Sequence, residues 1–200
     1  VGMNLDNVIM ELDAPEPPIM DGSAKYFVEA IEKVGIVAQE AERHEYIVHE
    51  VISYKNEETG SEITLIPADE YQVTTMVDFG TKILGTQNAY MHSLSEFKDD
   101  IANARTFSFL HELEVLLDKG LIKGGDLNNA IIYVDKEPSK ETMEKLKKVF
   151  NRDNVTVKPN GVLDNIDLHY SNEAARHKLL DVVGDLALVG VRIRGKVITN

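Results

Sequence analysis

The stretch EAARHKLLDVVGDL, residues 173–186, decides how the rest of the chain is interpreted. Its apolar positions recur at helical spacing, so we predict a helix over residues 172–188. His177, Asp181 and Asp185 follow one another at intervals of four, which places them within about 80° on one face of that helix. Because leucine and valine flank this polar stripe, we expect it to be narrow and partly buried.

This spacing is also one at which a helix can hold a metal ion. An imidazole and a carboxylate four residues apart can converge on one ion, as paired histidines at that spacing do on zinc. His177 and Asp181 are therefore candidate metal ligands, and Asp185 can support a neighbouring group. A solvated polar stripe is the more common meaning of such spacing and stays the alternative. Gly184, inside the helix, predicts close packing or the approach of a ligand.

Length and composition exclude several classes of protein. The 200 residues, 43% hydrophobic and 28% charged, suffice for a buried core. A formal net charge of −13 disfavours nucleic-acid binding. Without cysteine, any metal must be held by histidine and carboxylates, and a reducing compartment is expected. The sequence contains neither a membrane-spanning apolar run nor a signal-peptide pattern, so a cytoplasmic location is the expectation.

Outside the 172–188 helix, the pattern predicts strands and helices in mixed order. In the first part we expect a strand at 7–12, a helix opened by Ser23 and stopped by Gly35, and a polar linker at 36–43. In the second part we expect strands at 45–54, 61–67 and 71–79, followed by helices at 94–102 and 109–118. After these we expect a buried strand at 130–134, a helix at 139–150, an irregular excursion at 151–168 and a strand at 192–199. This order indicates an α+β fold in which a sheet is covered by helices.

Four stretches together resemble one enzyme family. Residues 175–186 are similar to the zinc-binding signature of the UDP-3-O-acyl-N-acetylglucosamine deacetylases, which catalyse the committed step of lipid A biosynthesis. The other matches are PIMDGSA at 18–24, ARTFSF at 104–109, and GLIKGG at 120–125 with NAI at 129–131. They occur in the family's order over nearly the whole chain. The excursion at 136–169 resembles the longer form in members fused to a 3-hydroxyacyl-carrier-protein dehydratase.

The resemblance implies an α+β fold of two-layer α/β sandwich domains, with a zinc site between them. Residues 1–41 would supply the C-terminal strand and helix of the first domain and a linker. Residues 42–200 would form a nearly complete second domain, with an insert that makes an acyl passage and the helix that carries zinc ligands. The third ligand, the general-base glutamate and a catalytic histidine are expected outside these 200 residues, which alone would be inactive.

The resemblance also assigns catalytic roles. His177 and Asp181 would bind zinc, and Thr106 would donate a hydrogen bond to the oxyanion of the tetrahedral intermediate. Asp185 would keep the catalytic histidine protonated, because a nearby negative charge raises the pKa of an imidazole.

Substrate contacts are implied in the same way. Phe107 would pack on the hexosamine ring, and Lys178 would meet the diphosphate or sugar oxygens. The apolar passage for the 3-O-acyl chain would be lined by Leu110, Leu113, Ile122, Leu127 and Ile132. Ordinary core packing is an open alternative for Phe107 and for each of these five side chains.

The sequence thus predicts zinc-dependent hydrolysis of the acetamide of UDP-3-O-acyl-N-acetylglucosamine, with release of acetate. Two alternatives stay open. One is a non-catalytic module that binds acylated sugars, and the other is a zinc amidohydrolase with a different substrate.

Overall fold

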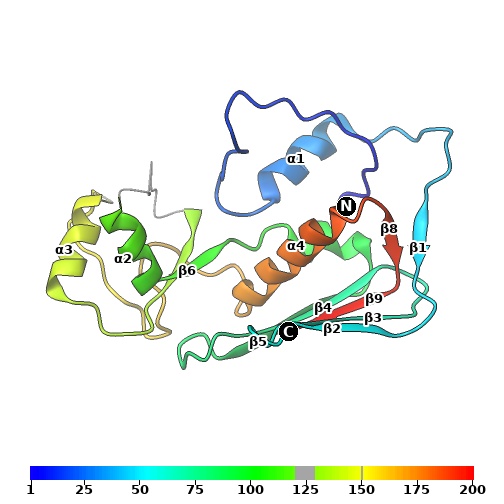
Figure 1. Cartoon of the computed structure of the whole chain (residues 1–200). Helices are drawn as coiled ribbons and strands as arrows, with labels where there is room; N and C mark the ends of the chain where they lie inside the picture. Colours follow the sequence, from blue (N-terminus) through cyan, green and yellow to red (C-terminus); the bar gives the residue numbers. More distant parts are fainter. Residues whose placement is uncertain (120–128, 150) are drawn as a thin grey trace.

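The computed structural model describes residues 1–119, 129–149 and 151–200. A five-stranded mixed sheet in the order β2-β3-β9-β4-β5 forms one layer (Figure 1). Its strands are β2 (Ile52–Lys55), β3 (Glu62–Ile66), β4 (Gln72–Asp78), β5 (Thr86–Met91) and β9 (Lys196–Thr199). β4 and β9 pair in parallel and the other neighbours are antiparallel. The α+β class expected from the sequence is confirmed.

Helix α4 (Glu173–Ala187) covers one face of this sheet. Ala175, Leu179 and Val183, spaced by four, are buried in a core that includes Val73, Met91 and Val197 of the sheet. Burial of this stripe stabilises the fold, since a fully buried leucine alone contributes about 1.5–3 kcal/mol. The polar positions of α4 are thereby turned away from the sheet.

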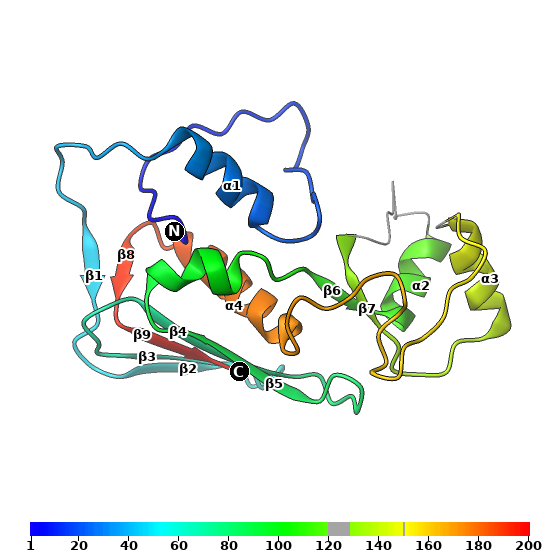
Figure 2. The same ribbon diagram turned by 180° about the vertical axis from the view of Figure 1, so that it is seen from behind.

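Helix α1 (Lys25–Val34) lies on the opposite side of α4 from the sheet (Figures 1 and 2). It ends where the sequence predicts, because the Gly35 amide donates to the Ile31 carbonyl with Gly35 at φ 79°. Its N-cap is Ala24 rather than the expected Ser23. The Ala24 amide donates to the carbonyl of Ala102 (2.9 Å), which attaches the start of α1 to the segment between the sheet and the insert.

The described residues in the ranges 107–119, 129–149 and 151–168 form a separate lobe, which we call the insert lobe (Figure 2). Its described elements are β6 (Phe107–Phe109), α2 (Leu110–Asp118), β7 (Ile131–Tyr133) and α3 (Lys140–Val149), with β6 and β7 paired in parallel. A buried cluster within it consists of Leu110, Ile132, Val134, Leu146, Val155 and Leu163. The helices predicted at 109–118 and 139–150, the strand at 130–134 and the irregular stretch at 151–168 agree with this arrangement.

Several predicted elements differ from the structure. The strand predicted at 7–12 is wrong: these residues are irregular and exposed, since no neighbouring strand pairs with them within the described residues. The runs at 45–54 and 192–199 are each divided, because β1 (Glu45–Ile47) pairs with β8 (Arg192–Arg194) in a separate two-stranded sheet. The helix predicted at 94–102 is a 3₁₀ turn, η1 (Leu94–Glu96), followed by a π turn, η2 (Phe97–Ile101).

Two strands, β5 and β6, were not predicted. β5 reads TQNAYM, and only Ala89 and Met91 are buried on its inner side, so its apolar alternation is too weak to detect. No helix in the described ranges combines the length and apolar character of a membrane span.

Candidate functional site

His177 and Asp181 face each other on α4, with 3.5 Å between His177 Nε2 and Asp181 Oδ1. The other ring nitrogen, Nδ1, lies 3.0 Å from the carbonyl oxygen of Ala104. Since a carbonyl can only accept, Nδ1 donates, and a neutral His177 then presents the lone pair of Nε2 to the carboxylate. The structure therefore brings the two expected ligands together.

The donor set suits zinc. A tetrahedral zinc ion with nitrogen and oxygen ligands at 2.0–2.2 Å holds two such atoms roughly 3.4 Å apart. A histidine that ligates metal commonly donates its other N–H to a carbonyl or carboxylate, as His177 does to Ala104. In the parts of the chain that the structure describes, no third histidine, aspartate or glutamate joins them to complete a set. A catalytic zinc site commonly has three protein ligands, so a further ligand would be needed beside this pair.

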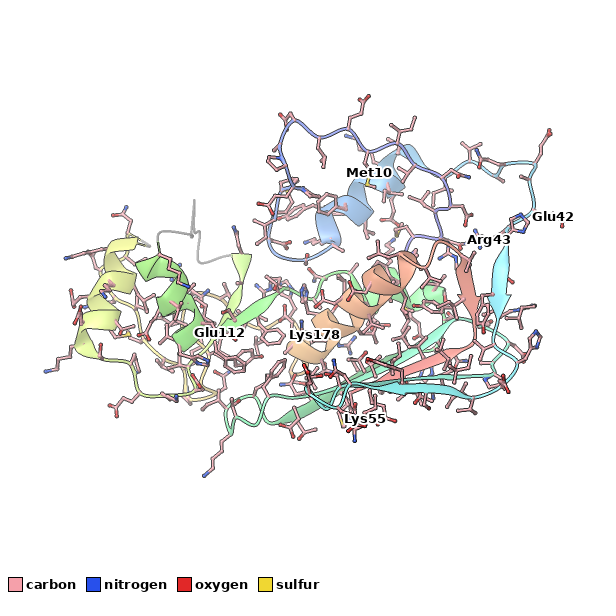
Figure 3. All side chains as sticks on the ribbon, viewed as in Figure 1. Met10, Glu42, Arg43, Lys55, Glu112 and Lys178 are labelled. Carbon is pink, nitrogen blue, oxygen red and sulfur yellow. The ribbon has the colours of Figure 1, made fainter. Side chains whose placement is uncertain are left out.

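Lys178 forms an ion pair with Asp181. Its ammonium donates to the other carboxylate oxygen of Asp181, Oδ2, at 2.9 Å, and lies 5.8 Å from the centre of the Phe107 ring. The side chain is 41% exposed, so the ammonium is accessible to an anion despite this ion pair. Figure 3 shows Lys178 on α4.

A pocket of about 350 Å³ opens beside His177. Three segments far apart in the sequence meet there: the turn before α1 with α1 itself, the residue before β6, and α4. The lining residues are Ile19, Gly22, Ser23, Ala24, Phe27, Thr106, His177 and Leu180. Thr106, the expected oxyanion donor, thus shares the pocket with the metal-ligand candidate.

The turn at residues 21–24 is locked by its own side chains. The amide and hydroxyl of Ser23 both donate to Asp21 Oδ1, and the Ser23 hydroxyl accepts from the Lys25 amide. Gly22 adopts φ 81°, a conformation that favours glycine. Its carbonyl accepts the Thr106 amide at 2.8 Å, so the turn fixes the backbone of the pocket wall.

Phe107 belongs to an aromatic cluster between the pocket and the insert lobe. Its ring makes edge contacts with Phe79 at 5.5 Å and with Tyr133 at 5.9 Å between centroids. Burial raises the pKa of Tyr133 to about 12, so this phenol stays neutral. Phe79 comes from the end of β4, and sequence reasoning missed it, since the only local signal is an aromatic residue beside a glycine in a turn.

The residues expected to line an acyl passage have different surroundings. Leu110 and Ile132 are buried in the core of the insert lobe, and Leu113 packs against it. Ile122 and Leu127 lie outside the described residues. Core packing thus accounts for the three described side chains, and the passage stays a prediction.

The solvent exposure of the polar stripe on α4, which consists of His177, Asp181 and Asp185, increases toward the C-terminal end of the helix. The side chain of His177 is 12% exposed and that of Asp181 is 36% exposed, and Asp185 is an exposed residue. The expectation of a partly buried stripe therefore holds only at its N-terminal end. Beyond the neighbouring backbone of α4, a Cβ at Gly184 would meet no described atom within 4 Å, so the close packing expected there is wrong for the described residues, and the approach of a ligand stays a prediction.

Comparison with known proteins gives one consistent result. The family model described as LpxC, UDP-3-O-acyl N-acetylglycosamine deacetylase, matches residues 1–152 and 141–200. A Porphyromonas gingivalis protein named bifunctional enzyme LpxC/FabZ is 43% identical over 99% of this chain and 43% of its own length. UDP-3-O-acyl-N-acetylglucosamine deacetylases of Syntrophus aciditrophicus and a Nostoc species are 34% and 36% identical, over 97% and 94% of this chain and 54% and 60% of their own lengths. The chain spans about half the length of these relatives.

Substitution of Gly22 tests whether the turn at residues 21–24 is closely packed in the pocket wall. A Cβ at Gly22 would lie 2.0 Å from the carbonyl oxygen of Asn129, whereas one at Gly35, also at positive φ, meets nothing within 4 Å. We expect Gly35→Ala to lower the free energy of unfolding by about 1–3 kcal/mol, because alanine is strained at φ 79° and ψ 174°. Gly22→Ala should cost about 1–3 kcal/mol more, because the backbone at Asn129 and the Thr106 methyl group must shift. Urea unfolding of both variants measures the difference, and equal losses would contradict this description of the turn.

Proposed function

The chain belongs to the UDP-3-O-acyl N-acetylglycosamine deacetylase family, and on this premise we propose that it takes part in zinc-dependent removal of the acetyl group from UDP-3-O-acyl-N-acetylglucosamine, within lipid A biosynthesis. The observation that carries the proposal is the pair formed by His177 Nε2 and Asp181 Oδ1, beside a pocket that Thr106 also lines. Substrate and reaction are those named for its relatives.

His177 and Asp181 would hold the metal ion. When bound, zinc supplies Lewis-acid activation of water and of an amide carbonyl. The hydrogen bond from His177 to Ala104 keeps the Nε2 lone pair available. The Lys178 ammonium holds Asp181 Oδ2, which leaves Oδ1 directed toward His177.

Other residues of the chain would bind and orient the substrate. The Thr106 hydroxyl, at the pocket wall, would donate a hydrogen bond to the amide oxygen as negative charge develops on it. The half-buried Phe107 ring offers an apolar face to the hexosamine, and the accessible ammonium of Lys178 offers a cation to the diphosphate. An acyl passage through the insert lobe is the corresponding proposal for the lipid chain.

Asp185 would act on a proton and not on the metal. Its exposed carboxylate lies one turn beyond Asp181 and is suited to hold a partner histidine in the protonated form. Such a histidine would give its proton to the departing amine, and the products are the free amino sugar and acetate. A cytoplasmic location belongs to the same proposal and is supported by the absence of cysteine.

Acetate release is the direct test of the reaction. The full-length protein is incubated with UDP-3-O-acyl-N-acetylglucosamine as prepared, after removal of metal by a chelator, and after zinc is added back. We expect release that the chelator abolishes and zinc restores, because two residues of α4 hold the ion that activates water. A folded, zinc-loaded protein that releases no acetate would favour an acyl-sugar binding module, and release from another acylated sugar only would favour a different amidohydrolase.

Asp181 and Asp185 form a matched pair of acids on one helix face. Asp181→Ala should weaken zinc binding by more than the roughly 10–100-fold that loss of an outer partner costs, and activity should fall with it. Asp185→Ala should retain zinc while kcat falls by about 100-fold or more, since it acts on a general acid. Zinc content by mass spectrometry and kcat are measured for both, and equal loss of metal in the two variants would refute this division of roles.

A further inference from the structure

Glu173 and Arg105 form a buried ion pair, and Glu173 lies one helical turn before the metal-ligand candidate His177. Glu173, on α4, is fully buried, and Arg105 is 8% exposed in its side chain. Glu173 Oε1 accepts from the Arg105 amide (3.1 Å) and from Arg105 Nε (2.8 Å). Glu173 Oε2 accepts from Arg105 Nη2 (3.3 Å) and from the His169 amide (2.6 Å). Both carboxylate oxygens are thus fully engaged.

The peptide unit between Ala104 and Arg105 makes two hydrogen bonds to side chains of α4, one through its N–H and one through its C=O. The N–H of the Ala104–Arg105 peptide donates to Glu173, and its C=O accepts from His177 Nδ1 at 3.0 Å. Because a peptide unit is planar, its C=O cannot turn away without also moving the N–H. Glu173 and His177 are one helical turn apart, so this single plane spans the turn and connects the two side chains.

Stability alone does not account for this ion pair. A buried ion pair must overcome the desolvation of both charges, and its replacement by apolar residues of similar volume is often neutral or stabilising. What apolar residues cannot do is bind the Arg105 amide and thereby hold the peptide plane in one orientation. Arg105 Nη2 adds a hydrogen bond to the Asp167 carbonyl at 2.5 Å, which ties the loop before α4 to the same point.

We propose that Glu173 and Arg105 are positioning residues that fix the ring of His177 as the Nδ1–H tautomer, with Nε2 directed at Asp181. The pair acts through the Ala104–Arg105 peptide and touches neither metal nor substrate. The consequence for zinc rests on the proposed function, whereas the effect on the tautomer does not, because it exists in the metal-free protein.

The test is the double variant Arg105→Met/Glu173→Leu in the full-length protein. We expect the double variant to fold with a lowered unfolding midpoint, because both charges leave together but the amides of Arg105 and His169 lose their acceptor. In the metal-free protein, ¹⁵N NMR of labelled histidine should show His177 shifting from the Nδ1–H form to a mixture of tautomers. Zinc affinity, measured by competition with a chelating dye, should fall about 10–100-fold.

Arg176→Met is the matched control. Arg176 lies on α4 and, like Arg105, donates to a backbone carbonyl, that of Asp100 (2.6 Å), and it packs over the Tyr170 ring. It has no bond to the 104–105 peptide among the described contacts. This variant should keep both the tautomer and the zinc affinity.

The outcomes distinguish failure of the positioning role of Glu173 and Arg105 from failure of the proposed zinc-dependent function. A double variant that keeps the Nδ1–H form and the parent's zinc affinity would overturn the positioning role. If the double variant does not fold, Arg105→Met/Glu173→Ala replaces it, because it also removes the acceptor of the Arg105 amide while leaving room for water to bind the freed amides. An unchanged tautomer there would equally overturn the role. A parent protein that binds no zinc contradicts the proposed function, while the tautomer shift still decides the positioning role.

Discussion

Helix α4 must bury one apolar stripe against the sheet, and this requirement decides where every candidate ligand lies. Ala175, Leu179 and Val183 occupy the face that meets the sheet. Residues offset from them by two positions are turned by about 200° and therefore face away from the sheet. His177 and Asp181 are such residues, so the packing that stabilises the fold also presents both to the pocket side.

The pocket side is assembled from backbone contacts between distant segments. The Gly22 carbonyl binds the Thr106 amide, and the Ala104 carbonyl binds the His177 ring. These contacts hold the turn before α1, the strand that enters the insert lobe and α4 in one arrangement (Figure 1). The N-terminal residues are held by side chains from distant segments, since Arg43 donates to Asp6 and Arg192 donates to the Val1 carbonyl, whereas Met10 farther along is 78% exposed (Figure 3). Site residues that come from three segments need such cross-links to keep their mutual geometry.

Sequence reasoning succeeded where one local period decides the outcome. The α4 helix and the His177–Asp181 pair follow from a spacing of four, and the end of α1 follows from Gly35. It failed where the partner is distant in sequence. The strand predicted at 7–12 has no neighbour to pair with among the described residues, and the bond from His177 to Ala104 spans 73 residues. Exposure of Asp185 depends on the end of the helix packing, which the period cannot reveal.

Whether His177 and Asp181 hold zinc is tested most directly by locating the ion in crystals of the full-length protein, from anomalous scattering at the zinc absorption edge. We expect a peak within about 2.0–2.2 Å of both His177 Nε2 and an Asp181 oxygen, with Nδ1 still bonded to the Ala104 carbonyl. A peak bound through Nδ1, or one located away from α4, would contradict it.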